Sequence, residues 1–208
     1  MMIVPVGLVD NWRHELNDVF HLDFEVFGIE GDVSDRHSNA FAKHDRLIAS
    51  VDTLKRKSRI KKILEAPPWD LIVFDEAHHL TATRTGNKVT KTLNYKLAEA
   101  MRDHCRDMLL LSATPHQGDH FRFWMLVRLL NSNLFSDEHD MVENRYRLNA
   151  VVIRRTKADA CTADGSTLFV RRLVHTEAFS LSEEENAFYQ DLLQYLQDGY
   201  NLSLIHIS

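Results

Sequence analysis

The feature that most constrains this chain is a short apolar run that ends abruptly in charged and imidazole side chains. The run, residues 71–74, reads Leu-Ile-Val-Phe and is followed by Asp75, Glu76, Ala77, His78 and His79. A run of branched and aromatic residues bounded by polar ones predicts a buried strand. Ligands bind at the carboxyl ends of the strands in open α/β sheets. Asp75 and Glu76 are therefore expected where a sheet of this kind presents its chemistry.

The two adjacent carboxylates need not share one role, because successive side chains of an extended segment point to opposite sides. One of them can hold a magnesium ion, a hard cation that prefers oxygen ligands. The other can orient or deprotonate an attacking water. An Asp-Glu pair alone is more often a solvated strand end, so the functional interpretation depends on further motifs.

Three further segments give this pair a context. Residues 109–111 form a second apolar run, which ends in the tetrapeptide Ser-Ala-Thr-Pro at 112–115. Near the start, Pro5 ends a short apolar run, and residues 12–15 read Trp-Arg-His-Glu. Far along the chain, residues 151–159 read Val-Val-Ile-Arg-Arg-Thr-Lys-Ala-Asp.

In this order, the motifs resemble those of superfamily 2 helicases and translocases. Asp-Glu-Ala-His at 75–78 is similar to their second, Walker B type motif, the DEAH box, and Ser-Ala-Thr-Pro is similar to their third. The segments at 5–15 and 151–159 resemble SWI/SNF-type and RapA-like ATPases. The resemblance implies a partial RecA-like lobe of the P-loop NTPase type, with a parallel sheet flanked by helices and a C-terminal helical extension. It implies part of an ATP-dependent DNA helicase or translocase that couples ATP hydrolysis to movement on nucleic acid.

The resemblance also implies a role for each motif residue. Asp75 would coordinate magnesium with ATP, directly or through water, and Glu76 would position or deprotonate the attacking water. His78 would link the nucleotide site to Ser112 and Thr114, so that the state of ATP affects the nucleic-acid groove. Trp12, in contrast, is interpreted as an apolar anchor that fixes its helix to the core.

Nucleic acid is the expected partner, and double-stranded DNA is the expected form. The resemblance points to Ser50, Asp52 and Gln117 as contact residues, since hydroxyls and helix N-termini suit phosphate groups. Ser50 or Asp52 could also cap the helix that follows. Residues 55–62 hold six positive charges in eight positions, which favours a solvated helix face over a phosphate contact. The sequence does not decide whether the motor unwinds strands or only translocates, or whether it prefers DNA or RNA. It does not identify protein partners either.

The chain carries no phosphate loop of the expected kind. Such a loop needs a glycine-rich turn that ends in Gly-Lys-Ser or Gly-Lys-Thr, and none of the seven glycines here is followed by lysine. The resemblance places that loop upstream of Pro5, and it places arginines that stabilise the transferring phosphate in a second lobe. We therefore expect a fragment that hydrolyses little ATP alone. The alternatives are a non-catalytic lobe that binds nucleic acid or protein, and a metal-dependent nuclease that uses Asp75, Glu76 and nearby histidines.

Hydrophobic periodicity predicts the order of the elements. Strands are expected at 2–6, 24–27, 46–50, 71–74 and 109–111, and helices at 8–20, 93–101 and after Asp119. The resemblance implies a further strand at 174–179 and a long helix at 183–200, where Ser182 and Glu185 match a capping box. Residues 81–92 are polar and predict an exposed loop. The expected division is a partial ATP-binding lobe at 1–135, a helical extension and exit at 136–200, and a possibly non-native tail at 201–208.

Composition narrows the class of protein. The net charge of -5 argues against a basic coat over the whole surface, although it leaves room for a local basic groove. Two well-separated cysteines, Cys105 and Cys161, indicate a reducing, cytoplasmic setting. No apolar run approaches the roughly 20 residues that span a bilayer, so no membrane partner is expected. The twelve histidines lack the ligand spacing of a zinc site.

Overall fold

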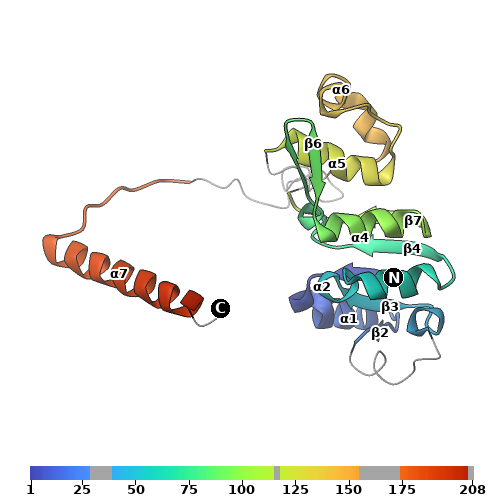
Figure 1. Ribbon diagram of the computed structural model, residues 1–208, viewed down its shortest axis with the longest axis horizontal. Helices are drawn as coiled ribbons and strands as arrows, with labels where there is room; N and C mark the ends of the chain where they lie inside the picture. The colour runs from blue at the N-terminus through green and yellow to red at the C-terminus, as the bar shows by residue number, and fades with distance from the viewer. Residues whose placement is uncertain (29–38, 115–117, 155–173, 206–208) are drawn as a thin grey trace, which may run out of the picture. The chain divides into compact units, whose positions relative to one another are not determined.

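A computed structural model describes residues 1–28, 39–114, 118–154 and 174–205 (Figure 1). Within the chain, one compact unit comprises Met1–Ile153 and a second comprises Arg154–Ser208. The first unit holds the sheet, both apolar clusters and the described residues of the motifs at 75–78 and 112–115. No helix in the described part of the chain combines the length and the apolar character needed to cross a membrane.

The first unit is built on a five-stranded parallel sheet in the order β2-β3-β1-β4-β7. Its strands are β1 (Met2–Val4), β2 (Glu25–Val26), β3 (Leu47–Ser50), β4 (Trp69–Phe74) and β7 (Cys105–Leu110). The central strands β1 and β3 are buried along their whole length, as expected of parallel strands covered on both faces. The α/β fold with a parallel sheet flanked by helices is therefore confirmed.

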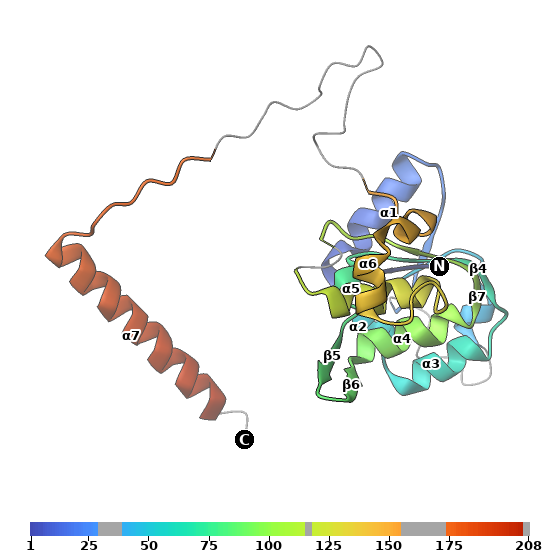
Figure 2. The same ribbon diagram turned by 90° about the horizontal axis from the view of Figure 1, so that it is seen from above.

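Helices cover both faces of this sheet (Figure 2). The helices of the first unit are α1 (Val9–Asp18), α2 (Val51–Leu54), α3 (Lys57–Leu64), α4 (Leu93–Arg102), α5 (His120–Leu130) and α6 (Glu138–Glu143), with short 3-10 turns η1 (Val6–Leu8), η2 (Ala40–Ala42), η3 (Ala77–His79) and η4 (Arg145–Ala150).

Side-chain alternation divides the core between the two faces. Residues such as Ile3 and Phe74 belong to the large cluster that α3, α4 and α5 help to build. Val4 and Val73 belong to a small cluster on the other face, where Leu16 of α1 packs.

The segment at 81–92 corrects the sequence-based prediction of an exposed loop. It forms an antiparallel hairpin of β5 (Ala82–Thr85) and β6 (Lys88–Lys91), with Thr85 opposite Lys88. Gly86, at φ 57, supplies the left-handed backbone that a tight two-residue turn requires. Most side chains of the hairpin are exposed. Its sequence therefore lacks the apolar pattern from which a strand is predicted.

The strand at the sheet edge begins earlier than predicted. The apolar residues 109–111 indicated only its end, whereas β7 starts at Cys105 and includes Arg106 and Asp107. In the described part of the sheet, β7 pairs with β4 alone. An edge strand accepts polar residues that a central strand would not, and these residues hid its first half.

Residues 136–153 pack with the sheet unit rather than apart from it. Met141 of α6 is buried in the large cluster, and the indole Nε1 of Trp124 in α5 donates to the Phe135 carbonyl at 3.5 Å. The functional division expected at residue 135 stays a prediction.

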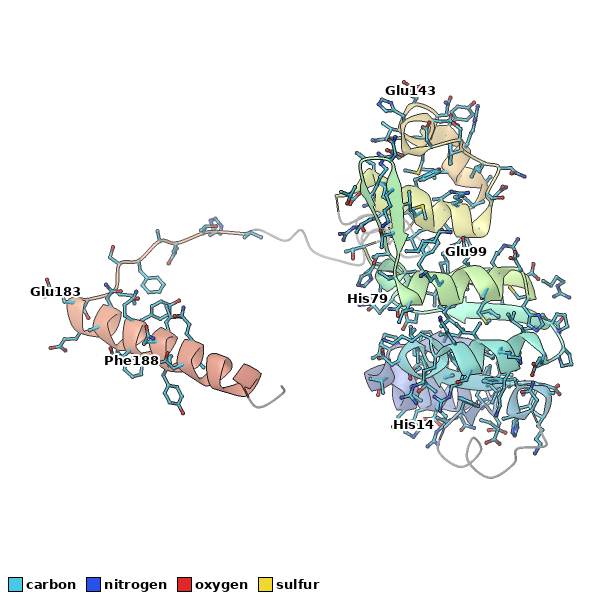
Figure 3. All side chains as sticks on the ribbon, viewed as in Figure 1. His14, His79, Glu99, Glu143, Glu183 and Phe188 are labelled. Carbon is cyan, nitrogen blue, oxygen red and sulfur yellow. The ribbon has the colours of Figure 1, made fainter. Side chains whose placement is uncertain are left out.

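The second unit contains one long helix, α7 (Glu183–Ile205). Its predicted capping box is confirmed, because Ser182 Oγ accepts from the Glu185 amide at 3.3 Å and Glu185 Oε2 accepts from the Ser182 amide at 2.9 Å. The predicted strand at 174–179 is wrong, since those residues have no regular secondary structure and pair with no strand among the described residues. Phe188, labelled in Figure 3, is 70% exposed.

Candidate active site

The site lies where the parallel strands end. The Asp75 amide donates to the Ile3 carbonyl at 2.9 Å, so the segment after β4 stays paired with β1. On the other side, the Leu111 amide donates to the Phe74 carbonyl at 2.8 Å, and the Ala77 amide donates to the Leu111 carbonyl at 2.8 Å. These bonds bring residues 75–78 of the first motif and residues 112–114 of the second to the same end of the sheet.

Asp75 has a hydrogen-bond donor on each carboxylate oxygen. The amide of Glu76 donates to Oδ1 at 2.8 Å, and the indole Nε1 of Trp12 donates to Oδ2 at 2.7 Å. The Trp12 ring packs, partly buried, against the small cluster, so its interpretation as an apolar anchor describes the ring and misses the indole N–H. Because each carboxylate oxygen has two lone pairs, both oxygens keep room for a further partner.

Glu76 turns the chain out of the strand. Its backbone lies in the left-handed region at φ 48 and ψ 45, a conformation that costs a residue with a side chain roughly 1–2 kcal/mol. The turn leads directly into η3, and the Glu76 side chain remains 37% exposed. Backbone strain of this kind often marks functional sites, and here it falls on the carboxylate predicted to act on water.

His78 joins the two motifs. Its Nδ1 lies 3.0 Å from Glu76 Oε2 and 3.2 Å from Ser112 Oγ. Ser112 Oγ also accepts from the Thr114 amide at 3.3 Å. A proton on Nδ1 lets the ring donate to the carboxylate, which can only accept. The structure thus connects Glu76, His78, Ser112 and Thr114 in one continuous chain of contacts.

The structure describes two of the three residues predicted to contact nucleic acid. Ser50 is 5% exposed, and its Oγ caps α2 by accepting from the Thr53 amide at 3.1 Å, so the predicted cap is confirmed. Asp52 lies in the first turn of α2 and pairs with Lys55. Gln117 lies outside the described residues. Contact of these three residues with nucleic acid stays a prediction.

The donor set at the strand end fits a magnesium ion that is carried by a nucleotide. In the described part of the chain, no three His, Cys, Asp or Glu side chains are grouped to hold a metal. Magnesium in nucleotide sites does not need such a cage, because one or two carboxylates, waters and phosphates hold it. Asp75, fixed by two neutral donors, offers that kind of carboxylate.

Comparison with known proteins finds one matching family and a solved structure with a similar fold. The model of the SNF2-related domain matches residues 1–203 of this chain. Among solved structures, the fold is similar to the Sulfolobus solfataricus SWI2/SNF2 ATPase core in complex with double-stranded DNA, with a TM-score of 0.56 and 22% sequence identity. The match covers 76% of this chain and 34% of that chain, so this chain spans about a third of its length. At this identity the likeness shows the fold alone.

Proposed function

The chain belongs to the family of SNF2-related domains, and on that premise we propose that it is part of an ATP-dependent motor that moves along double-stranded DNA. The observation that carries the proposal is the chain of contacts from Glu76 through His78 to Ser112 at the ends of β4 and β7. Within the family, we assign residues 75–78 the role of a DEAH box and the chain to the RapA-like group. The motor as a whole needs parts that this chain does not contain, above all a loop for the phosphates.

In this proposal, Asp75 holds magnesium together with ATP. The ion, when bound, neutralises charge on the phosphate oxygens. The Glu76 carboxylate orients the attacking water and accepts its proton on an Oε atom. His78, whose Nδ1 is 3.0 Å from Glu76 Oε2, keeps that carboxylate oriented.

The same histidine provides the link to movement. His78 Nδ1 also lies 3.2 Å from Ser112 Oγ, and Ser112 holds the Thr114 amide. A change at the Glu76 carboxylate therefore reaches the segment after β7 through two contacts. We assign Ser112 and Thr114 the coupling of ATP hydrolysis to the nucleic-acid groove.

Double-stranded DNA is the proposed track. The solved relative is a complex with double-stranded DNA, which supports this choice, and Ser50, Asp52 and Gln117 are the proposed contact residues. The net charge of -5 means that the contact must be local rather than spread over the surface.

The test is DNA-stimulated phosphate release by the full-length protein that contains this chain, compared with its Glu76→Gln variant. Loss of the proton acceptor is expected to reduce turnover by about 10²–10⁴-fold while ATP binding remains. The matched control is Glu65→Gln, a carboxylate at the end of α3 whose side chain is 57% exposed, which is expected to leave turnover unchanged.

Unchanged turnover in the Glu76→Gln variant would refute the assignment of Glu76. A full-length protein that neither binds ATP nor releases phosphate would instead favour a non-catalytic binding lobe. The 208-residue chain alone is expected to show no release above background.

A further inference from the structure

Trp12 makes a contact that the proposed function does not yet use. It belongs to α1, which follows β1, whereas Asp75 follows β4, the neighbour of β1 in the sheet. The indole Nε1 reaches across this boundary and donates to Asp75 Oδ2 at 2.7 Å. A distance of 2.7 Å is at the short end for N–H donors, as expected when the acceptor is ionised.

The other two tryptophans show that this arrangement is specific to one residue. Trp124 Nε1 donates to the Phe135 carbonyl at 3.5 Å. Trp69 Nε1 is buried without a hydrogen-bond partner. Among the three tryptophans, only Trp12 presents its N–H to a carboxylate.

The chemistry of an indole suits the task of orienting a carboxylate that binds a cation. An indole N–H donates and cannot accept, so it never competes for the metal as a ligand. It is also neutral, whereas a lysine or arginine at this place would offset the negative charge that attracts the cation. With the Glu76 amide on Oδ1, the indole on Oδ2 leaves the carboxylate one orientation and one free lone pair on each oxygen.

Packing explains why the indole can serve as a rigid donor. Val9, Trp12 and Leu16 lie along one side of α1 and pack against the small cluster of the sheet. A ring held in this way loses little further freedom when its N–H binds.

We propose that Trp12 is a positioning residue for Asp75: it holds one carboxylate oxygen while the Glu76 amide holds the other, and so prepares the carboxylate for the metal. The inference rests on the proposed role of Asp75, and it adds α1 to the elements that build the nucleotide site. Second-layer partners of metal ligands typically change metal affinity or activity by 10–100-fold when they are removed.

The first experiment measures the contact itself in the ¹⁵N-labelled 208-residue chain. Trp12→Phe deletes one of three indole N–H signals and thereby assigns it. Asp75→Asn is then expected to shift the Trp12 indole signal more than those of Trp69 and Trp124, because only Trp12 loses an ionised acceptor. A Trp12 signal that does not respond to Asp75→Asn overturns the inference.

The second experiment measures the consequence for the metal. Mn²⁺, a paramagnetic substitute for Mg²⁺, is titrated in the presence of a non-hydrolysable ATP analogue against the full-length protein that contains this chain and against its Trp12→Phe, Trp69→Phe and Asp75→Asn variants. The bound ion is read by electron paramagnetic resonance. Trp12→Phe is expected to raise the dissociation constant about 10-fold or more. Trp69→Phe, which removes an indole N–H without a partner, is expected to leave it unchanged.

The outcomes separate the inference from the function on which it rests. Equal Mn²⁺ affinity in the Trp12→Phe and unsubstituted chains overturns a positioning role. Mn²⁺ binding that Asp75→Asn does not weaken, beside an indole signal that responds to Asp75→Asn, overturns the metal role of Asp75 while the contact stands.

Discussion

Glu76 combines a left-handed backbone, at φ 48 and ψ 45, with a side chain that contacts His78. The strain and the contact can be separated by comparing two substitutions that both remove the carboxylate. Glu76→Gly relieves the left-handed penalty of about 1–2 kcal/mol, whereas Glu76→Ala retains it. The greater conformational entropy of unfolded glycine offsets about 0.5–1 kcal/mol of this gain, so the Gly variant is expected to be the more stable by up to about 1.5 kcal/mol.

Urea unfolding of the two variants measures this difference. The control is the same pair at Glu65, whose backbone is right-handed at φ -84 and ψ -12, and where Ala is expected to be the more stable. An Ala variant that equals or exceeds the Gly variant at position 76 would show that the backbone there is unstrained.

Ionisation of Tyr95 is expected to lower the free energy of unfolding at high pH. It is 1% exposed, its hydroxyl donates to the Met125 carbonyl at 3.1 Å, and burial, followed by the nearby Glu99, raises its pKa to about 12 from 10.0. Between these pH values the folded chain keeps a proton that the unfolded chain has lost. Folding is therefore expected to weaken as the pH rises from 10 to 12.

Tyr95→Phe should flatten this alkaline decline, because phenylalanine has no proton to lose. The free energy of unfolding by urea at pH 9, 10 and 11 provides the measurement. Tyr146→Phe is the matched control, since Tyr146 is 69% exposed and should leave the slope unchanged. An equal slope in the parent and Tyr95→Phe would place the decline elsewhere.

At the scale of secondary-structure elements, one threonine side chain binds both the start of α4 and the base of the hairpin. Thr92 Oγ1 accepts from the Tyr95 amide at 3.2 Å as the N-cap of α4, and it donates to the Thr81 carbonyl at 2.8 Å, at the base of the hairpin. Thr92→Ala is expected to destabilise the chain by about 1–2 kcal/mol, the upper part of the range for a lost cap.

The urea midpoint tests this expectation, with Thr92→Ser as the control because serine keeps the hydroxyl. A Ser variant as unstable as the Ala variant would assign the effect to the lost methyl group rather than to the two hydrogen bonds.

For the molecule as a whole, the core belongs to the first unit. Every buried apolar residue in the described part of the chain, from Met1 to Met141, and every partly buried one packed against it, up to Val151, lies within residues 1–153. A chain of residues 1–153 is therefore expected to unfold cooperatively, with a melting temperature within about 4 °C of the full chain, which corresponds to about 1 kcal/mol at this size.

Circular dichroism during heating measures both chains. Loss of the cooperative transition in the shorter chain would mean that residues 154–208 contribute to the core in a way that the contacts of the first unit do not reveal.

The sequence was most informative where local pattern and burial agree. The apolar runs before Asp75 and Ser112 predicted two strands, because buried strand residues are apolar, and the resemblance implied the parallel sheet and the link between the two motifs. The hairpin at 82–91 and the first half of β7 were not predicted, since exposed strands and edge strands carry polar residues whose pattern is also typical of loops.

The sequence by itself determined the α/β class and the presence of Asp75, Glu76 and His78 at a strand end, because hydrophobic periodicity and strand termini are local properties. The resemblance implied the link from His78 to Ser112, and the structure supplies its contact. Only the tertiary structure decided that Trp12 holds Asp75. Helical spacing identifies which face of a helix is buried, but not which polar atom its aromatic ring will meet. That depends on how α1 lies across the sheet, and residues 63 positions apart come together only there.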